Sequence, residues 1–145
     1  MKFVKNLFAF ATDLNLEKIN KSKCEISIVD DDLFCRMMTH ERIKDLGYTN
    51  VNTFSCGEDY LNHIKVPSKN QRIVFLDHEM TGISGFELLK KIRTKNLKIM
   101  VVMVSGQEDM KIAIQSFQNG VFCYINKGDS IEEKIKQVLN RIQET

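Results

Sequence analysis

Residues 72–79 of this chain read RIVFLDHE, and this stretch decides the fold. The apolar run from Ile73 to Leu76 has no polar break, as in a strand that is covered on both faces. Asp77 follows this strand directly, and the loop-forming residues 78–85, HEMTGISG, come next. The carboxyl end of a buried parallel strand is where open α/β sheets place functional residues, although an Asp in this position also commonly caps the following turn.

Length and composition indicate one globular domain. The chain has 145 residues, of which 43% are hydrophobic and 28% are charged. No apolar run approaches the roughly 20 residues that a membrane-spanning helix needs. These values exclude a disordered chain and a protein embedded in a bilayer.

The charge distribution argues against a nucleic-acid partner. The formal net charge is +2, and residues 1–23 alone carry five lysines against one Asp and one Glu. The remaining chain is close to neutral, which differs from the basic surface of a typical nucleic-acid-binding protein. We therefore expect no nucleic acid to bind.

Cysteine and histidine spacing gives no sign of a disulfide framework or a zinc site. The four cysteines form no CxxC pair and no convincing secretory signal precedes them, which favours a reducing, cytoplasmic location. The three histidines lack metal-ligand spacing, so we expect structural or exposed positions for His40, His63 and His78.

Residues 1–23 are expected to form a separate N-terminal segment, with the main domain at residues 24–145. Apolar residues recur at helical spacing between Phe3 and Ala11, and the sequence then becomes polar. This pattern predicts a short amphipathic helix followed by a tether. The helix could dock onto a partner, dimerise the chain, anchor it weakly to a membrane surface, or fold onto the domain itself.

From residue 25 onward, strand and helix patterns alternate. Strands are predicted at 26–29, 51–54, 73–76, 99–104 and 121–125. Helices are predicted at 33–46, 57–64, 85–93 and 110–117, and a last helix begins at the capping-box pattern SIEE of residues 130–133. Five alternating pairs predict a doubly wound α/β domain with a five-stranded parallel sheet and helices on both faces.

The predicted strand ends bring together three acids, a hydroxyl and a cation. These are Asp30, Asp31, Asp77, Ser105 and Lys127. Neighbouring carboxylates repel one another, and oxygen ligands of this kind favour Mg²⁺ as the compensating cation. The set suits phosphoryl transfer to a carboxylate, with Asp77 as the nucleophile, Mg²⁺ bridging the acids and phosphoryl oxygens, and Lys127 and Ser105 binding the remaining oxygens.

Four motifs at these strand ends resemble the receiver domain of two-component response regulators. They are IVDDD at 28–32, VFLD at 74–77 with GISGFELL after it, MVSG at 103–106, and CYINK at 123–127. The resemblance covers residues 25–143 and requires all four motifs in order. It implies a flavodoxin-like fold with strand order 2-1-3-4-5.

The resemblance also implies a role for each matching residue. It implies an Mg²⁺ site made by Asp30, Asp31, Asp77 and the main-chain carbonyl of Glu79. Asp77 corresponds to the phosphoacceptor and Lys127 to the lysine that pairs with the phosphoryl group. Ser105 and Tyr124 correspond to the switch residues that respond to phosphorylation.

Several residues depart from the usual family pattern. Thr81 and Gly128 stand where prolines are usual, and Ser84 stands where an aspartate is usual. We expect an altered loop after Lys127 rather than a loss of phosphorylation. By the same resemblance, we expect the side chains of Glu79 and Gln107 to tune dephosphorylation.

The expected function is that of a stand-alone response regulator. A histidine kinase or phosphotransfer protein would phosphorylate Asp77, and a downstream protein would bind the phosphorylated form. Such a protein assists its own phosphorylation and dephosphorylation but is not an enzyme acting on a separate substrate. The alternatives are an unphosphorylated interaction module with the same fold, and a phosphatase with an aspartate nucleophile, which would need a second Asp where this chain has Glu79.

Overall fold

The computed structural model describes residues 21–95, 98–106, 109–128 and 130–144. The predicted N-terminal helix and Gln107 lie outside the described residues, so both remain predictions. Lys21, the first described residue, donates a hydrogen bond of 3.0 Å from Nζ to the carbonyl oxygen of Leu46. No helix within the described ranges is long and apolar enough to cross a membrane.

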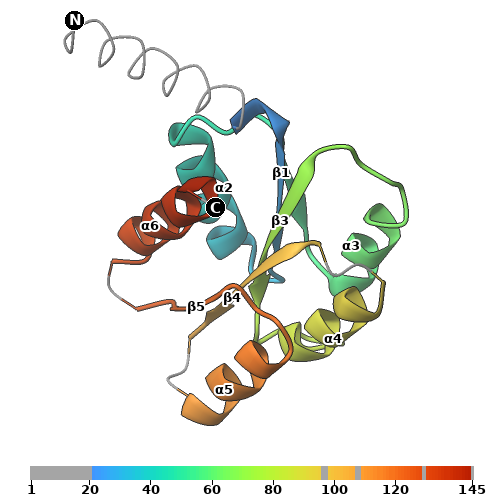
Figure 1. The fold of residues 1–145 in the computed structure, drawn as a ribbon. Coiled ribbons are helices and arrows are strands. Elements are labelled where there is room, and N and C mark those ends of the chain that lie inside the picture. Colours follow the sequence, from blue (N-terminus) through green and yellow to red (C-terminus); the bar gives the residue numbers. More distant parts are fainter. Residues whose placement is uncertain (1–20, 96–97, 107–108, 129, 145) are drawn as a thin grey trace, which may run out of the picture.

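A five-stranded parallel sheet forms the centre of the domain, in the order β2-β1-β3-β4-β5 (Figure 1). The strands are β1 (Cys24–Val29), β2 (Val51–Phe54), β3 (Gln71–Asp77), β4 (Met100–Ser105) and β5 (Cys123–Asn126). The helices are α2 (Leu33–Asp45), α3 (Gly57–His63), α4 (Gly85–Lys95), α5 (Met110–Gln118) and α6 (Ile131–Glu144). The predicted α/β class and strand order are confirmed.

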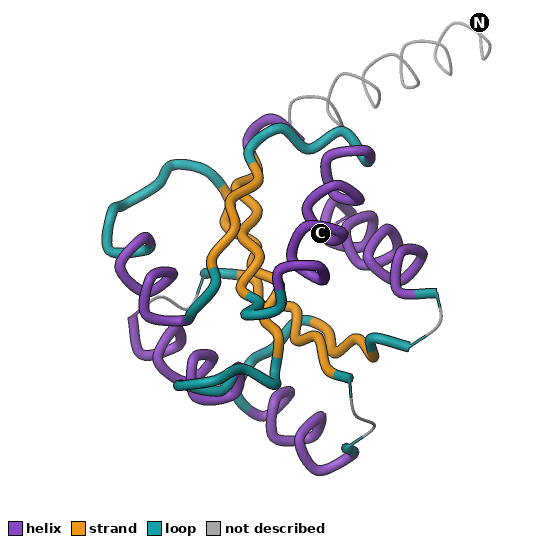
Figure 2. The backbone as a smooth tube through the Cα atoms, turned by 180° about the vertical axis from the view of Figure 1, so that it is seen from behind, coloured by secondary structure: helices purple, strands orange, loops and turns teal. Residues whose placement is uncertain are grey.

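The central strand β3 divides the core into two layers. Ile73 and Phe75 pack in the cluster that α2 and α6 cover, whereas Val74 and Leu76 pack in the cluster on the side of α3 and α4. Figures 1 and 2 show α2 and α6 on one face of the sheet and α3, α4 and α5 on the other. All four side chains are buried, because a strand at the centre of a doubly wound sheet has no face turned to water.

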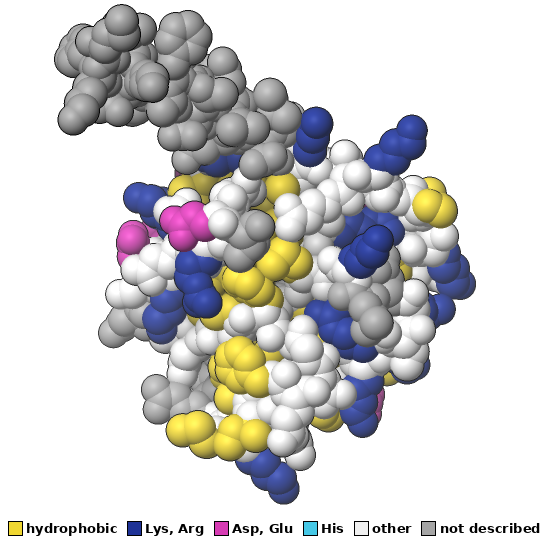
Figure 3. All heavy atoms as spheres, viewed as in Figure 1, with side chains coloured by type: hydrophobic (Ala, Val, Ile, Leu, Met, Phe, Trp, Pro, Cys, Tyr) yellow, Lys and Arg dark blue, Asp and Glu magenta, His cyan; other side chains and the backbone are white. Residues whose placement is uncertain are grey.

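The apolar patterns of α2 and α5 predicted the helices but not the burial of their side chains. Phe34 in α2 is 72% exposed, and Ile43 is the only buried residue of that helix. In α5 the stripe of Met110, Ile114 and Phe117 is exposed, and Figure 3 shows hydrophobic side chains over this helix. A helical period shows that apolar residues share a face, but it does not show that another element covers that face.

A buried ion cluster joins β1 and β3 at the amino-terminal edge of the sheet. Glu25 Oε1 lies 2.6 Å from His63 Nε2 and 3.2 Å from Arg72 Nε. The Arg72 guanidinium also donates to the carbonyl oxygens of Ile64 and Val66, which follow α3. The cluster therefore ties the loop between α3 and β3 to the sheet.

Glu25→Ala is expected to lower the free energy of unfolding by about 2 kcal/mol, because it leaves the buried Arg72 guanidinium without its carboxylate. Urea unfolding measures the change. A double variant with Arg72→Met should lose less than the sum of the two single variants, because no unpaired charge remains. Strictly additive losses would contradict the coupling.

Candidate functional site

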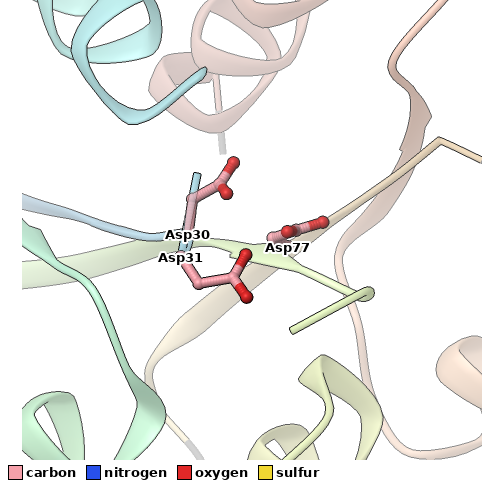
Figure 4. A group of neighbouring side chains, drawn as sticks. All are labelled: Asp30, Asp31 and Asp77. Atoms are coloured by element: carbon pink, nitrogen blue, oxygen red, sulfur yellow. The ribbon is translucent and has the colours of Figure 1, made fainter. Parts of the chain in front are cut away.

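Three carboxylates from two neighbouring strand ends meet at one edge of the sheet. Asp30 and Asp31 follow β1, and Asp77 is the last residue of β3. One oxygen from each side chain lies within 4.8 Å of the other two. Figure 4 shows the three side chains gathered around the ends of these strands. The convergence predicted from the sequence is confirmed for these residues.

Lys127 supplies the cation of this cluster. It follows β5, and its Nζ lies 3.0 Å from Asp77 Oδ1 and 3.3 Å from Asp30 Oδ2. Asp30 and Asp77 are 5% and 4% exposed, so their charges are poorly screened by water. A lysine 97 residues away in the sequence from Asp30 thus neutralises part of the negative charge.

The ionisation of Asp77 reflects its burial. Desolvation raises the pKa of this carboxyl to about 6, against the lowering effect of the Lys127 hydrogen bond and with a further rise from the charge of Asp30. Burial alone would lower the pKa of Lys127, but the hydrogen bond to Asp77 and the charges of both acids raise it instead. Asp77 is therefore available as an anion above about pH 6, next to a protonated lysine.

The donor set fits Mg²⁺. Carboxylate oxygens are the protein ligands that this ion prefers, and three of them lie close enough together to share one ion. A divalent cation would also offset the repulsion that a single lysine leaves uncompensated. Asp30, Asp31 and Asp77 would hold the ion, and the main-chain carbonyl of Glu79 stays a predicted further protein ligand.

Thr81 holds the side chain of Asp31, a role that the sequence did not reveal. Its main-chain N–H and its hydroxyl both donate to Asp31 Oδ2, at 2.9 and 3.2 Å. A proline, usual at this position in the family that the motifs resemble, has neither donor. The departure at Thr81 thus adds two hydrogen bonds that orient an acid of the site.

Asp32 is the N-cap residue of α2 and so fixes the direction of the chain after the acidic pair. Its side chain accepts a hydrogen bond of 2.8 Å from the main-chain N–H of Cys35, and this hydrogen bond lowers the pKa of Asp32. In turn, the main-chain N–H of Asp32 donates to Asp30 Oδ1 at 2.9 Å. An Asp immediately before the first residue of a helical run is a recognisable signal for this cap.

Ser105 lies beside the acidic cluster, at the end of β4. It is fully buried, and its hydroxyl donates to Glu79 Oε1 at 3.4 Å. Tyr124 in β5 packs partly buried against the core, and its hydroxyl oxygen is enclosed without a hydrogen-bond partner among the described residues. The structure therefore brings the Glu79 side chain to the predicted switch serine.

The loop after Lys127 differs from one that contains a proline. The main-chain N–H of Gly128 donates to Asn126 Oδ1 at 2.9 Å, a bond that a proline at 128 could not form. Ser130 has a φ of 69°, so it does not adopt the extended conformation that the predicted capping box requires. The start of α6 was predicted correctly, but this detail of its cap was wrong.

Lys127→Ala is expected to destabilise the metal-free protein by about 1–3 kcal/mol at pH 8, because Asp30 and Asp77 lose their shared cation. The loss should be smaller at pH 5, where Asp77 with its pKa of about 6 is mostly protonated. Urea unfolding at both pH values measures it, with the exposed Lys136→Ala in α6 as a control. An equal loss of stability at pH 5 and pH 8 would contradict the proposed charge interaction between Lys127 and ionised Asp77.

Comparison with known sequences identifies a family that shares these features. The model of the response regulator receiver domain matches residues 26–140. Chemotaxis protein CheY-3 of Vibrio cholerae is 30% identical over 132 residues, which cover 88% of this chain and 100% of that protein. The DNA-binding transcriptional regulator NtrC of Escherichia coli is 29% identical over 111 residues, which cover 77% of this chain. The match covers only 23% of NtrC, so the chain corresponds to a small part of that relative.

A solved structure agrees with the sequence matches. The receiver domain of NtrX from Brucella abortus superposes with a TM-score of 0.74 and 27% sequence identity. The superposition covers 83% of this chain and 99% of the NtrX domain. The five-stranded arrangement is therefore that of a solved receiver domain.

Proposed function

Because this chain belongs to the family of response regulator receiver domains, we propose that Asp77 accepts a phosphoryl group from a phosphohistidine. The observation that carries the proposal is the position of the Asp77 carboxylate, 3.0 Å from Lys127 Nζ and beside two further acids. Receiver domains bind Mg²⁺ at an acidic pocket, and the acids of this chain meet the same requirement.

In the proposed step, an oxygen of ionised Asp77 attacks phosphorus while the bond from phosphorus to the donor nitrogen breaks. The electron pair of that bond stays on the imidazole, which takes up a proton. Lys127 lies close enough to Asp77 to stabilise the charge on the phosphoryl oxygens. Mg²⁺, when bound, would neutralise those oxygens further.

A protein donor is supported by an apolar recess next to Asp77. The recess has a volume of about 210 Å³ and is bordered by Phe34, Met38 and Ile131 as well as by Asp77 and Lys127. Phe34 and Met38 are exposed large hydrophobic residues at the beginning of α2. A kinase or phosphotransfer protein would bury them while it presents its phosphohistidine.

Ser105 and Tyr124 would transmit the effect of phosphorylation from Asp77 to the protein surface. Phosphorylation adds negative charge and new hydrogen-bond acceptors, which would draw the Ser105 hydroxyl away from Glu79. Tyr124 lies two strand residues from the end of β5, next to the α5 helix with its exposed Met110 and Phe117. We infer that a downstream protein binds this face, and that the population shift between two conformations controls its affinity.

We infer further that the protein signals as a single receiver domain and does not turn over a separate substrate. The match to CheY-3, which spans all of that protein, supports this inference. The rival possibility is a receiver fold that binds its partner without phosphorylation. Chemical phosphorylation distinguishes the two.

The test is to incubate the protein with Mg²⁺ and acetyl phosphate, and to locate the acyl phosphate by borohydride reduction and peptide mass spectrometry. A single reduced residue at position 77, absent when EDTA is added, is the expected result. No modification, or modification at another residue, would refute the assignment. Release of phosphate from free phosphomonoesters would favour a phosphatase instead.

A further inference from the structure

A group of basic side chains gathers at the sheet edge opposite to Asp77. Residues 64–72 and 90–98 together contain eight Lys or Arg residues and no Asp or Glu, although the whole chain carries only +2. The first stretch leads into β3 and the second contains the end of α4 and leads into β4, so both lie at the amino-terminal edge of the sheet. Figure 3 shows Lys and Arg side chains gathered on the side of the molecule where α3 and α4 lie in Figure 1.

These two stretches enclose a concave pocket. Its volume is about 560 Å³, and its lining includes five cations and no acid: Lys65, Lys69, Arg72, Lys95 and Lys98. Ser68, Asn70 and Gln71 add polar groups to the same lining. The volume lies in the range of small-molecule sites.

The local structure explains only some of these charges. Arg72 pairs with Glu25, and Lys95 lies in the last turn of α4, where a cation complements the helix dipole. Lys65 and Lys69 lie in the loop between α3 and β3, and neither residue is part of a helix. The Lys65 ammonium donates to the neutral Asn62 side chain at 2.8 Å, and neither Lys65 nor Lys69 forms an ion pair within the part of the chain that the structure describes. A bound ligand or solvent ions must therefore offset the repulsion between the charges of Lys65 and Lys69.

We propose that this pocket, the basic pocket, binds a ligand that carries condensed phosphate groups, such as a di- or triphosphate. Several lysines around one small volume match a ligand with at least three negative charges. A lysine ammonium binds phosphate as a point charge with three rotatable donors, so several lysines can reach different oxygens of one condensed phosphate. The basic pocket is separate from the phosphoacceptor site, because the two lie at opposite ends of the strands.

The test is calorimetric titration with sodium tripolyphosphate in EDTA, so that no metal phosphate forms at Asp77. The double variant Lys65→Glu/Lys69→Glu should raise the dissociation constant at least tenfold. The control variant Lys111→Glu/Lys136→Glu changes the net charge by the same amount at exposed positions of α5 and α6. Its dissociation constant should stay within twofold of the wild-type value. Amide shifts in residues 64–72 should accompany binding to the wild-type protein.

The proposal would be overturned by an equal loss of affinity in the two double variants, by the absence of saturable binding to the wild-type protein, or by equal binding of sodium sulfate at matched ionic strength. Tighter binding of a polyglutamate peptide at the same residues would show that the pocket takes an acidic peptide and would also overturn it.

Further titrations identify the source of the phosphate groups. Nucleoside triphosphates that bind more tightly than tripolyphosphate would point to a nucleotide. Vesicles that retain the protein only when they contain polyphosphorylated headgroups would point to a lipid. Circular dichroism reports the fold, and binding of Mg²⁺ with beryllofluoride reports the Asp77 site; both should be unchanged in the two double variants. A failure of the basic pocket to bind phosphate can therefore be distinguished from a failure of the proposed function at Asp77.

Discussion

Asp77→Asn is expected to abolish phosphorylation by acetyl phosphate and, at the same time, to stabilise the metal-free protein. The amide has no anionic oxygen to attack phosphorus, so the acyl phosphate cannot form. The amide also removes a buried negative charge beside Asp30, while Lys127 keeps its contact with Asp30 at 3.3 Å. The free energy of unfolding should rise by about 1–2 kcal/mol at pH 8.

The pH dependence of this gain has a definite sign. The pKa of Asp77 is about 6 in the folded protein and near the ordinary value of 3.8 in the unfolded chain. Between these values the folded protein retains a proton that the unfolded chain releases, so wild-type stability falls relative to the variant as pH rises. The gain of Asp77→Asn should therefore be absent below about pH 4 and complete above about pH 7.

Urea unfolding in EDTA at pH 4, 5, 6 and 8 measures this gain. Asp45→Asn, an exposed position at the end of α2, is the matched control and should show no such profile. Mg²⁺ should stabilise the wild-type protein and Asp45→Asn but not Asp77→Asn. If Asp77→Asn were less stable than the wild-type protein at pH 8, the Asp77 carboxylate would stabilise the fold, and the prediction would be wrong.

Gly85→Ala is expected to lower the free energy of unfolding by about 3 kcal/mol, through a steric clash with the main chain of the phosphoacceptor Asp77. A Cβ at residue 85 would overlap the main-chain oxygen of Asp77 and lie 2.8 Å from the Cα of His78. Main-chain atoms cannot rotate away as a side chain can, so the loop after β3 must shift. That shift would also strain the hydrogen bond of 3.1 Å from the Gly85 N–H to the His78 carbonyl.

Gly128→Ala is the matched control for this prediction. A Cβ at residue 128 would meet only Asn126 Oδ1, at an ordinary 3.5 Å, so the change in stability should stay within about 0.5 kcal/mol. Thermal unfolding compares the two variants, and chemical phosphorylation shows whether Asp77 remains correctly placed. Wild-type stability in Gly85→Ala would mean that the turn after β3 has more room than the structure gives it.

The central strand and the strand-end residues could be predicted because their signals are local. A run that is apolar at every position, as from Ile73 to Leu76, is typical of a strand covered on both faces, and parallel strands bring their carboxyl ends to one edge. These two rules were enough to bring Asp30, Asp77 and Lys127 together. The family resemblance added the strand order, which the structure confirms.

Other features depend on contacts that no local pattern encodes. Thr81 holds Asp31 across 50 residues of sequence, and Glu25 meets His63 and Arg72 from two other elements. The exposure of Met110 in α5 depends on which neighbours cover that helix, not on its period. The basic pocket could not be predicted from the net charge either, because the net charge sums over surfaces that lie far apart.

The pairing of β3 with strands on both sides also sets the order in which the domain opens. The amides of Ile73 to Leu76 lie between β1 and β4, so they should exchange hydrogen with solvent only through global unfolding. By contrast, β5 pairs only with β4 among the described strands, and the neighbouring α5 buries only Ser116. The face proposed to bind the downstream protein therefore lies at an edge of the sheet that is expected to open at a lower free energy than β3. A bound partner would slow hydrogen exchange there first.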